Sequence, residues 1–131
     1  MKINFTVFGI PKAQARPRLV RNRNFVYSPK TDWYYKVLNE AKKYKPLIQI
    51  DKPVSLIIYF HLPKPKSLKK NILFHSKRPD LDNLEKAVLD ACTNAGIWID
   101  DSLVCNKFSR KTYSDHPGIE ISIEEILNEK N

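Results

Sequence analysis

The sequence predicts an α+β fold in which one mixed β-sheet carries two main helices, with the elements in the order βαβαββ. Three observations support this prediction. Residues 2–9 and 118–126 alternate apolar and polar side chains, two inner segments repeat apolar residues at helical spacing, and residues 53–62 are apolar nearly throughout. With 131 residues, of which 42% are hydrophobic, the chain can form one domain over residues 1–131 without disulfides or a structural metal.

A basic, proline-marked loop spans residues 10–27 and leads into the first helix. Within it, Phe25–Tyr27 favours a short strand. Ser28 and Pro29 suit the N-cap and first position of a helix that Pro46 ends. The apolar side chains of this helix recur at helical spacing: Tyr34, Val37, Leu38, Ala41 and Tyr44.

The second helix is expected to begin near Asp82, to run to Asn94 or Ala95, and to stop at Gly96. Its buried stripe is expected to consist of Leu81, Leu84, Val88, Ala91, Cys92 and Ala95. The apolar residues 72–74, in the loop before it, form either a packed turn or an exposed apolar element.

The remaining strands complete the sheet. Residues 53–62 are expected to lie in its centre, because a strand buried on both sides is apolar throughout. Strands are also predicted over residues 103–113 and 118–126, and the turn at residues 115–118 is expected to join them as a hairpin.

Cysteine usage and hydropathy indicate a cytoplasmic protein that does not enter a membrane. Cys92 and Cys105 lack metal-site spacing, and we expect both to be buried, reduced core thiols. Trp98, between two isoleucines, is also expected in the core. No apolar run approaches the roughly 20 residues of a membrane span, and residues 1–9 are too polar for a signal peptide.

The net charge of +9 favours a polyanionic partner, and its distribution strengthens that interpretation. Residues 10–31 and the segment between Lys52 and Pro79 contain many basic residues and no acid. Such segregation is typical of a phosphate-binding surface. The side chains that we expect to contact DNA are Lys12, Arg16, Arg18, Arg21, Arg23, Lys64, Lys66, Lys69, Lys70 and Arg78.

Acidic residues are concentrated in one stretch of this basic chain, residues 78–101, where Lys86 is the single base after Arg78. Its acids are Asp80, Asp82, Glu85, Asp90, Asp100 and Asp101. An acidic cluster repels the polyanion that the rest of the chain attracts, unless a divalent cation lies between carboxylate and phosphate. Aspartates without nearby histidine suit Mg²⁺ better than zinc. We therefore expect a metal-dependent phosphodiesterase acting on nucleic acid.

Each feature of this stretch also has a purely structural explanation. Asp82 and Glu85 fit a capping box, and Asp82 and Lys86 fit an ordinary ion pair one helical turn apart. Asp100 and Asp101 could form a plain turn. Capping would leave Asp80 and the Asp100–Asp101 pair unexplained, which favours the functional interpretation of the whole set.

The motif R-P-D-L-D-N-L-x-K-A-x-L-D-A, followed by A-G-x-W-x-D-D-S-x-V, resembles the RusA-like Holliday junction resolvases of bacteria and their prophages. The close match covers residues 78–104, and the basic early loop and element order extend the resemblance over most of the chain. Family members differ in the length of the segment before the motif, and this segment, residues 63–77, is long here.

The resemblance implies a homodimeric, Mg²⁺-dependent endonuclease of DNA recombination and repair, in which Mn²⁺ can substitute and no organic cofactor is needed. It would cut four-way DNA junctions by paired, symmetrical nicks. The resemblance assigns metal binding to Asp80, Asp82 and Asp101, with Asp100 in a supporting metal role, and essential or sensitive catalytic positions to Lys86 and Asn83. Two alternatives remain open: a non-catalytic nucleic-acid-binding module, and a nuclease that acts on other branched DNA.

Overall fold

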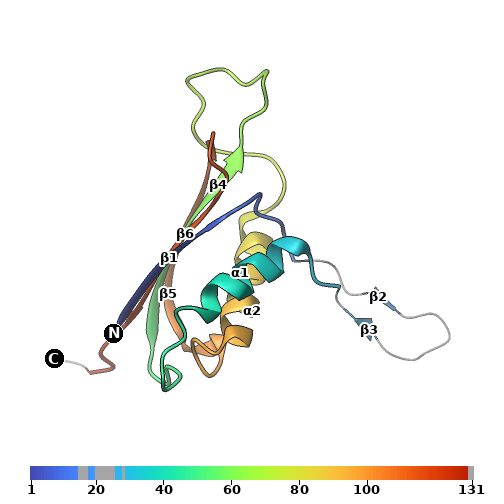
Figure 1. Cartoon of the computed structure of the whole chain (residues 1–131). Coiled ribbons are helices and arrows are strands. Elements are labelled where there is room, and N and C mark those ends of the chain that lie inside the picture. Colours follow the sequence, from blue (N-terminus) through green and yellow to red (C-terminus); the bar gives the residue numbers. More distant parts are fainter. Residues whose placement is uncertain (15–17, 20–25, 28, 130–131) are drawn as a thin grey trace.

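The computed structural model describes residues 1–14, 18–19, 26–27 and 29–129, and it confirms the predicted mixed sheet with two helices on one face (Figure 1). The elements in chain order are β1 (Lys2–Phe8), β2 (Arg18–Leu19), β3 (Val26–Tyr27), α1 (Asp32–Lys42), β4 (Val54–Pro63), α2 (Leu81–Ala95), a 3-10 turn η1 (Asp101–Leu103), β5 (Val104–Ser114) and β6 (Gly118–Glu125). β2 and β3 pair with each other, and the other strands form the main sheet.

The main sheet has the strand order β1-β6-β4-β5. β6 is antiparallel to both β1 and β4, whereas β4 and β5 are parallel and are connected through α2. A parallel pair requires such a crossover because the chain must return to the same end of the sheet. β4 is therefore an inner strand, as predicted, but its side chains alternate between buried and half-buried because the helices cover one face.

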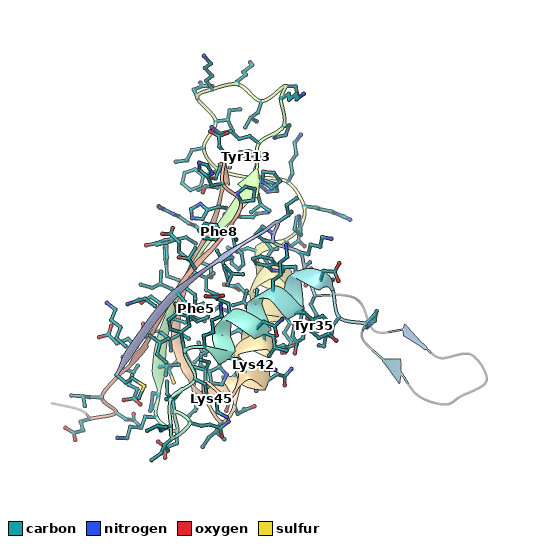
Figure 2. All side chains as sticks on the ribbon, in the orientation of Figure 1. Phe5, Phe8, Tyr35, Lys42, Lys45 and Tyr113 are labelled. Carbon is teal, nitrogen blue, oxygen red and sulfur yellow. The ribbon has the colours of Figure 1, made fainter. Side chains whose placement is uncertain are left out.

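The core lies between that face and the helices. Phe60 and Leu56 of β4 are fully buried, and so is Trp33 of α1. Trp98 is also fully buried, which confirms its predicted place in the core. The Trp98 indole donates to Thr93 Oγ1 at 2.7 Å, so its polar atom is satisfied inside the core. Phe5 of β1 belongs to this core, whereas Tyr35 and Lys42 of α1 are exposed (all three are labelled in Figure 2).

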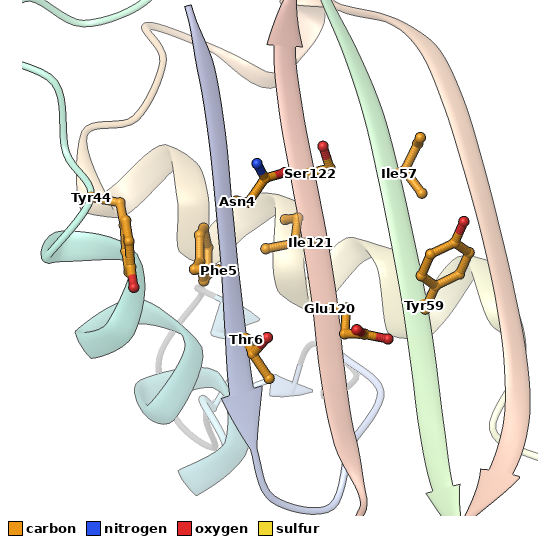
Figure 3. Close-up of a pocket in the computed structure, with 9 residues that line it drawn as sticks. All are labelled: Asn4, Phe5, Thr6, Tyr44, Ile57, Tyr59, Glu120, Ile121 and Ser122. Atoms are coloured by element: carbon orange, nitrogen blue, oxygen red, sulfur yellow. The ribbon is translucent and has the colours of Figure 1, made fainter.

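The opposite face of the sheet is open. A shallow groove crosses it, and Figure 3 shows its lining from β1, β6 and β4, including Asn4, Thr6, Glu120 and Tyr59. The predicted carboxylates belong to α2 and η1, and none of them lines this groove. Within the described part of the chain, no helix is long and apolar enough to cross a membrane.

The expected hairpin between the last two strands is not formed. β4 lies between β5 and β6, so Ser114 is opposite Pro63 of β4 while Gly118 is opposite His61. The turn therefore crosses the end of β4, where Pro63 has no amide to continue the ladder. Gly118 begins β6 at a φ of +158°, and a Cβ there would lie 2.4 Å from the Val7 carbonyl oxygen, so the close approach to β1 requires glycine.

The first helix also differs from the prediction at both ends. It begins at Asp32, because the Thr31 hydroxyl accepts a hydrogen bond from the Tyr34 amide at 3.1 Å and takes the N-cap position. Ser28 lies outside the described residues. The helix ends at Lys42, before Pro46, and Tyr44 beyond it stacks on Phe5.

The second helix agrees closely with the prediction, starting one residue earlier and ending at Gly96, which has a φ of +86°. Cys92 on this helix is buried as expected, and burial raises the pKa of its thiol to about 12. Cys105, in contrast, is exposed. It falls where the register between β4 and β5 shifts, between Val104 and Asn106, so the expectation of a second core thiol was wrong.

The apolar residues of the loop before α2 are exposed rather than packed. Ile72, Leu73 and Phe74 have exposed fractions of 41%, 55% and 59%. Phe74 forms an isolated antiparallel bridge with Thr112 of β5, so this part of the loop extends the edge of the sheet.

Candidate metal and nucleic-acid site

The predicted carboxylates belong to the beginning of α2 and to η1. Asp80 occupies the N-cap position of α2, but its side chain makes no capping hydrogen bond. Asp82 follows in the first turn, and its Oδ1 accepts from the Asn83 amide at 3.0 Å. Both carboxylates are exposed, and neither forms an ion pair with a side chain that the structure describes.

Asp100 and Asp101 lie where the chain leaves the core and enters η1. Asp100 Oδ2 accepts from the Ser102 amide at 3.2 Å, which makes it the N-cap of η1. Hydrogen bonds from the side chain and then the backbone of Ser102 hold the pKa of Asp100 below its usual value. Asp100 is therefore ionised at neutral pH, as a metal ligand must be.

Lys86 links this turn to α2. Its Nζ lies 3.0 Å from Asp90 Oδ1 and 3.8 Å from Asp101 Oδ2, so it joins these two acids rather than forming the ordinary pair with Asp82. The hydrogen bond to Asp90 is the main cause that raises the pKa of Lys86. A permanent positive charge is thus held beside Asp101.

Most of the predicted site residues line two hollows along α2, whereas Asp82 lines neither of them. Arg78, Asp80 and Asn83 line one of them, together with residues 13–14. Asp100 and Asp101 line the second, together with Lys30, Lys86, Asp90 and two polar residues of α2. The Gln14 amide donates to the Asn83 carbonyl at 3.1 Å, which ties the basic early loop to the first turn of α2.

The donor chemistry fits a hard divalent cation, because the exposed groups are carboxylate and amide oxygens. Among the described residues, however, no three acidic, histidine or cysteine side chains already form a grouped metal site. Asp82 and Lys86 are one turn of α2 apart, which corresponds to about 6 Å along the helix. Asp80 and Asp82 thus lie at one end of the site, and Asp101 lies beside Lys86 at the next turn.

Glu85 connects α2 to β5, which the sequence did not predict. The capping box with Asp82, which was the structural alternative, is absent, since Glu85 points instead to β5 and is buried. It accepts a hydrogen bond from the Ser109 hydroxyl, and its Oε1 lies 3.2 Å from Lys107 Nζ. The local spacing of Asp82 and Glu85 suits a cap equally well, so only the long-range contact with β5 distinguishes the two arrangements.

The predicted DNA contacts are distributed over two loops. Lys12 is exposed in the loop that follows β1, and Lys64, Lys66, Lys69, Lys70 and Arg78 are exposed in the connection between β4 and α2. Lys64 Nζ lies 3.9 Å from Asp115 Oδ2, and both side chains are exposed. Arg16, Arg21 and Arg23 lie outside the described residues, and Arg18 is described only as part of the β2 backbone.

Comparison with known proteins matches the chain to one family over most of its length. The model of the family described as endodeoxyribonuclease RusA matches residues 9–124. The chain is 36% identical to the uncharacterized protein YqaN of Bacillus subtilis (strain 168), over 95% of this chain and 96% of that protein. It is 35% identical to the crossover junction endodeoxyribonuclease RusA of Escherichia coli (strain K12), over 59% of this chain and 56% of that enzyme. The corresponding enzyme of Enterobacteria phage 82 shows the same identity and coverage.

Proposed function

This chain belongs to the RusA endodeoxyribonuclease family, and we propose that it resolves four-way DNA junctions by Mg²⁺-dependent phosphodiester hydrolysis in recombination and repair. One observation carries the proposal. Within the matched residues, exposed carboxylates begin α2, and the same helix carries a lysine that contacts a further carboxylate in η1. A basic protein with such an acidic site is suited to a phosphodiester substrate.

In this proposal Asp80, Asp82 and Asp101 hold the metal, and Asp100 supports them. Mg²⁺ held by these residues would offset the negative charge of the phosphate and would lower the pKa of the attacking water, which makes that water a better nucleophile. Lys86, kept protonated by Asp90, offsets negative charge that grows on the phosphate in the transition state. Asn83 offers an amide that can hold a phosphate oxygen beside Asp80.

The basic loops then hold the DNA arms by contacts to phosphates. Because such contacts release counterions, junction affinity is expected to fall steeply as salt concentration rises. A four-way junction is approximately twofold symmetric, so we propose that a homodimer with twofold symmetry presents one site to each of two opposed strands. Paired, symmetrical nicks would follow from this arrangement.

The test uses a labelled synthetic four-way junction and a matched linear duplex, each incubated with the protein and either Mg²⁺ or EDTA. We expect symmetrical nicks in the junction, in Mg²⁺ only. Binding without cutting would instead indicate a non-catalytic binding module. If the duplex or another branched DNA were cut as fast as the junction, the result would still support a metal-dependent nuclease but would refute the selectivity for junctions.

Site variants test the residue assignment. Asp80→Asn, Asp82→Asn and Asp101→Asn are each expected to abolish nicking while junction binding survives, because each loses an anionic metal ligand and keeps its shape. Asp51→Asn is the matched control, since Asp51 is an exposed aspartate in the segment between α1 and β4. Nicking by all three site variants at the control rate would overturn the assignment.

A further inference from the structure

The segment that carries Asp80 is attached to β5 before it enters α2. The Tyr113 amide donates to the Leu73 carbonyl at 2.9 Å, and the His75 amide donates to the Lys111 carbonyl at 3.2 Å. These bonds hold the segment along the edge of the sheet as far as His75. Among the described residues, no further backbone hydrogen bond joins residues 76–79 to β5.

The Lys111 side chain makes that connection. Its Nζ donates to the Lys77 carbonyl at 2.5 Å and to the Pro79 carbonyl at 2.7 Å. The two carbonyls lie on either side of Arg78, and the second belongs to the residue directly before Asp80. An ammonium group that donates to both of them fixes the backbone at two points.

The position of Asp80 depends on that backbone. Its carboxylate occupies the N-cap position of α2 without a capping hydrogen bond, so the helix itself does not orient it. Lys111 lies on the same side of β5 as Lys107 and Ser109, since side chains two residues apart on a strand share a face. Those two hold Glu85 in α2, and Lys111 holds the chain just before the helix.

We propose that Lys111 is a positioning residue for the nuclease reaction, which fixes the Lys77–Pro79 backbone and thereby places Asp80. The inference rests on the proposed function. The Lys111 side chain is half-buried, and its ammonium is engaged by two carbonyls, so it is poorly placed to serve as a phosphate contact. Its effect on the reaction passes through Asp80.

The first test compares three variants in single-turnover nicking of the junction over a range of Mg²⁺ concentrations. Lys111→Met keeps an unbranched side chain of similar length and removes the donors, and we expect about a 10- to 100-fold slower nicking rate, as for a displaced reacting group. The Mg²⁺ concentration for half-maximal rate should rise, and junction affinity should stay within about twofold of the parent value. Lys111→Arg should recover most of the rate, because it keeps a cationic donor.

Lys107→Met is the matched control. It removes the same charge from the same face of β5, but Lys107 contacts Glu85 rather than the segment before α2. We expect it to nick at close to the parent rate, because Ser109 still donates to Glu85. An equal loss in both lysine variants would refute the inference, as would a loss of junction affinity that accounts for the whole effect of Lys111→Met.

A second measurement does not depend on activity. Amide hydrogen exchange, followed by mass spectrometry without metal or DNA, should be faster in peptides covering residues 76–84 of Lys111→Met, and unchanged there in Lys107→Met. Unchanged exchange in Lys111→Met would overturn the inference. If the parent protein fails to nick the junction, the proposed function fails, whereas faster exchange would still support the anchoring of this segment by Lys111.

Discussion

Replacing Glu85 by alanine tests how firmly α2 is held against β5. Glu85 is buried, with a side chain that is 10% exposed, and the Ser109 hydroxyl donates to its carboxylate. A hydrogen bond to a charged group contributes about 1.5–3 kcal/mol. The Lys107 partner is 42% exposed, so solvent screening limits that ion pair to about 1 kcal/mol at most.

Glu85→Ala should therefore lower the free energy of unfolding by about 2–4 kcal/mol. Urea unfolding measures this directly, with the fluorescence of the buried Trp33 and Trp98 as the probe. The slope of the transition should stay the same. Glu85→Gln is the milder control, because its amide oxygen can still accept from Ser109, and we expect it to cost about 1–2 kcal/mol from the weakened bond and the lost ion pair.

A double-mutant cycle isolates the contact between Glu85 and Ser109. If the hydroxyl and the carboxylate interact as described, Glu85→Ala and Ser109→Ala should be less than additive, with a coupling free energy of about 1 kcal/mol or more. A cost of Glu85→Ala below about 0.5 kcal/mol, the range of an ordinary surface substitution, would refute the reasoning. Strict additivity of the two substitutions would refute it as well.

Three further predictions concern the core, the thiols and pH. Phe60→Ala should lower the free energy of unfolding by about 3–5 kcal/mol, whereas Phe108→Ala, at a position 54% exposed, should cost under about 1 kcal/mol in the same urea titration. A thiol reagent should label Cys105 in the native protein and reach the buried Cys92 only after denaturation, which mass spectrometry of the labelled peptides would show. Burial lowers the pKa of His75 below 6.5, so the unfolded state binds this proton more readily, and stability is lost as pH falls through 6.5. His75→Gln should therefore lose less stability than the parent between pH 7.5 and 5.5 in thermal melts; an equal loss would contradict this prediction.

The elements were predictable where a local pattern determines them. Alternation identified the half-buried strands β1 and β6, and Gly96 marked the end of α2 because a residue there needs positive φ. The pairing of strands was not predictable in the same way. The short turn between β5 and β6 suggests a hairpin, but β6 pairs with β1 and β4 instead. The residues of the turn do not determine which strands pair with β6.

The candidate site shows the same division between local and long-range information. The sequence placed Asp82 and Lys86 one helical turn apart, but in the structure Lys86 contacts Asp90, one turn further along α2, at 3.0 Å. That Lys86 also approaches Asp101, and that Glu85 turns to β5, depends on how η1 and β5 pack against α2. Lys111 was not predicted for a similar reason, since its partners are backbone carbonyls, which every sequence contains.

The strand order of the sheet has a consequence for synthesis of the protein. β1 pairs with β6, and the partner of Phe8 in this pairing is Gly118. The ribosome synthesises Gly118 more than a hundred residues after Phe8. A ribosome that adds about 5–20 residues per second needs roughly 5–20 seconds to synthesise the residues between them. During this interval β1 lacks the strand with which it pairs in the sheet. Pairing between strands that are far apart in the sequence also forms slowly. The main sheet can therefore be completed only after β6 has been synthesised.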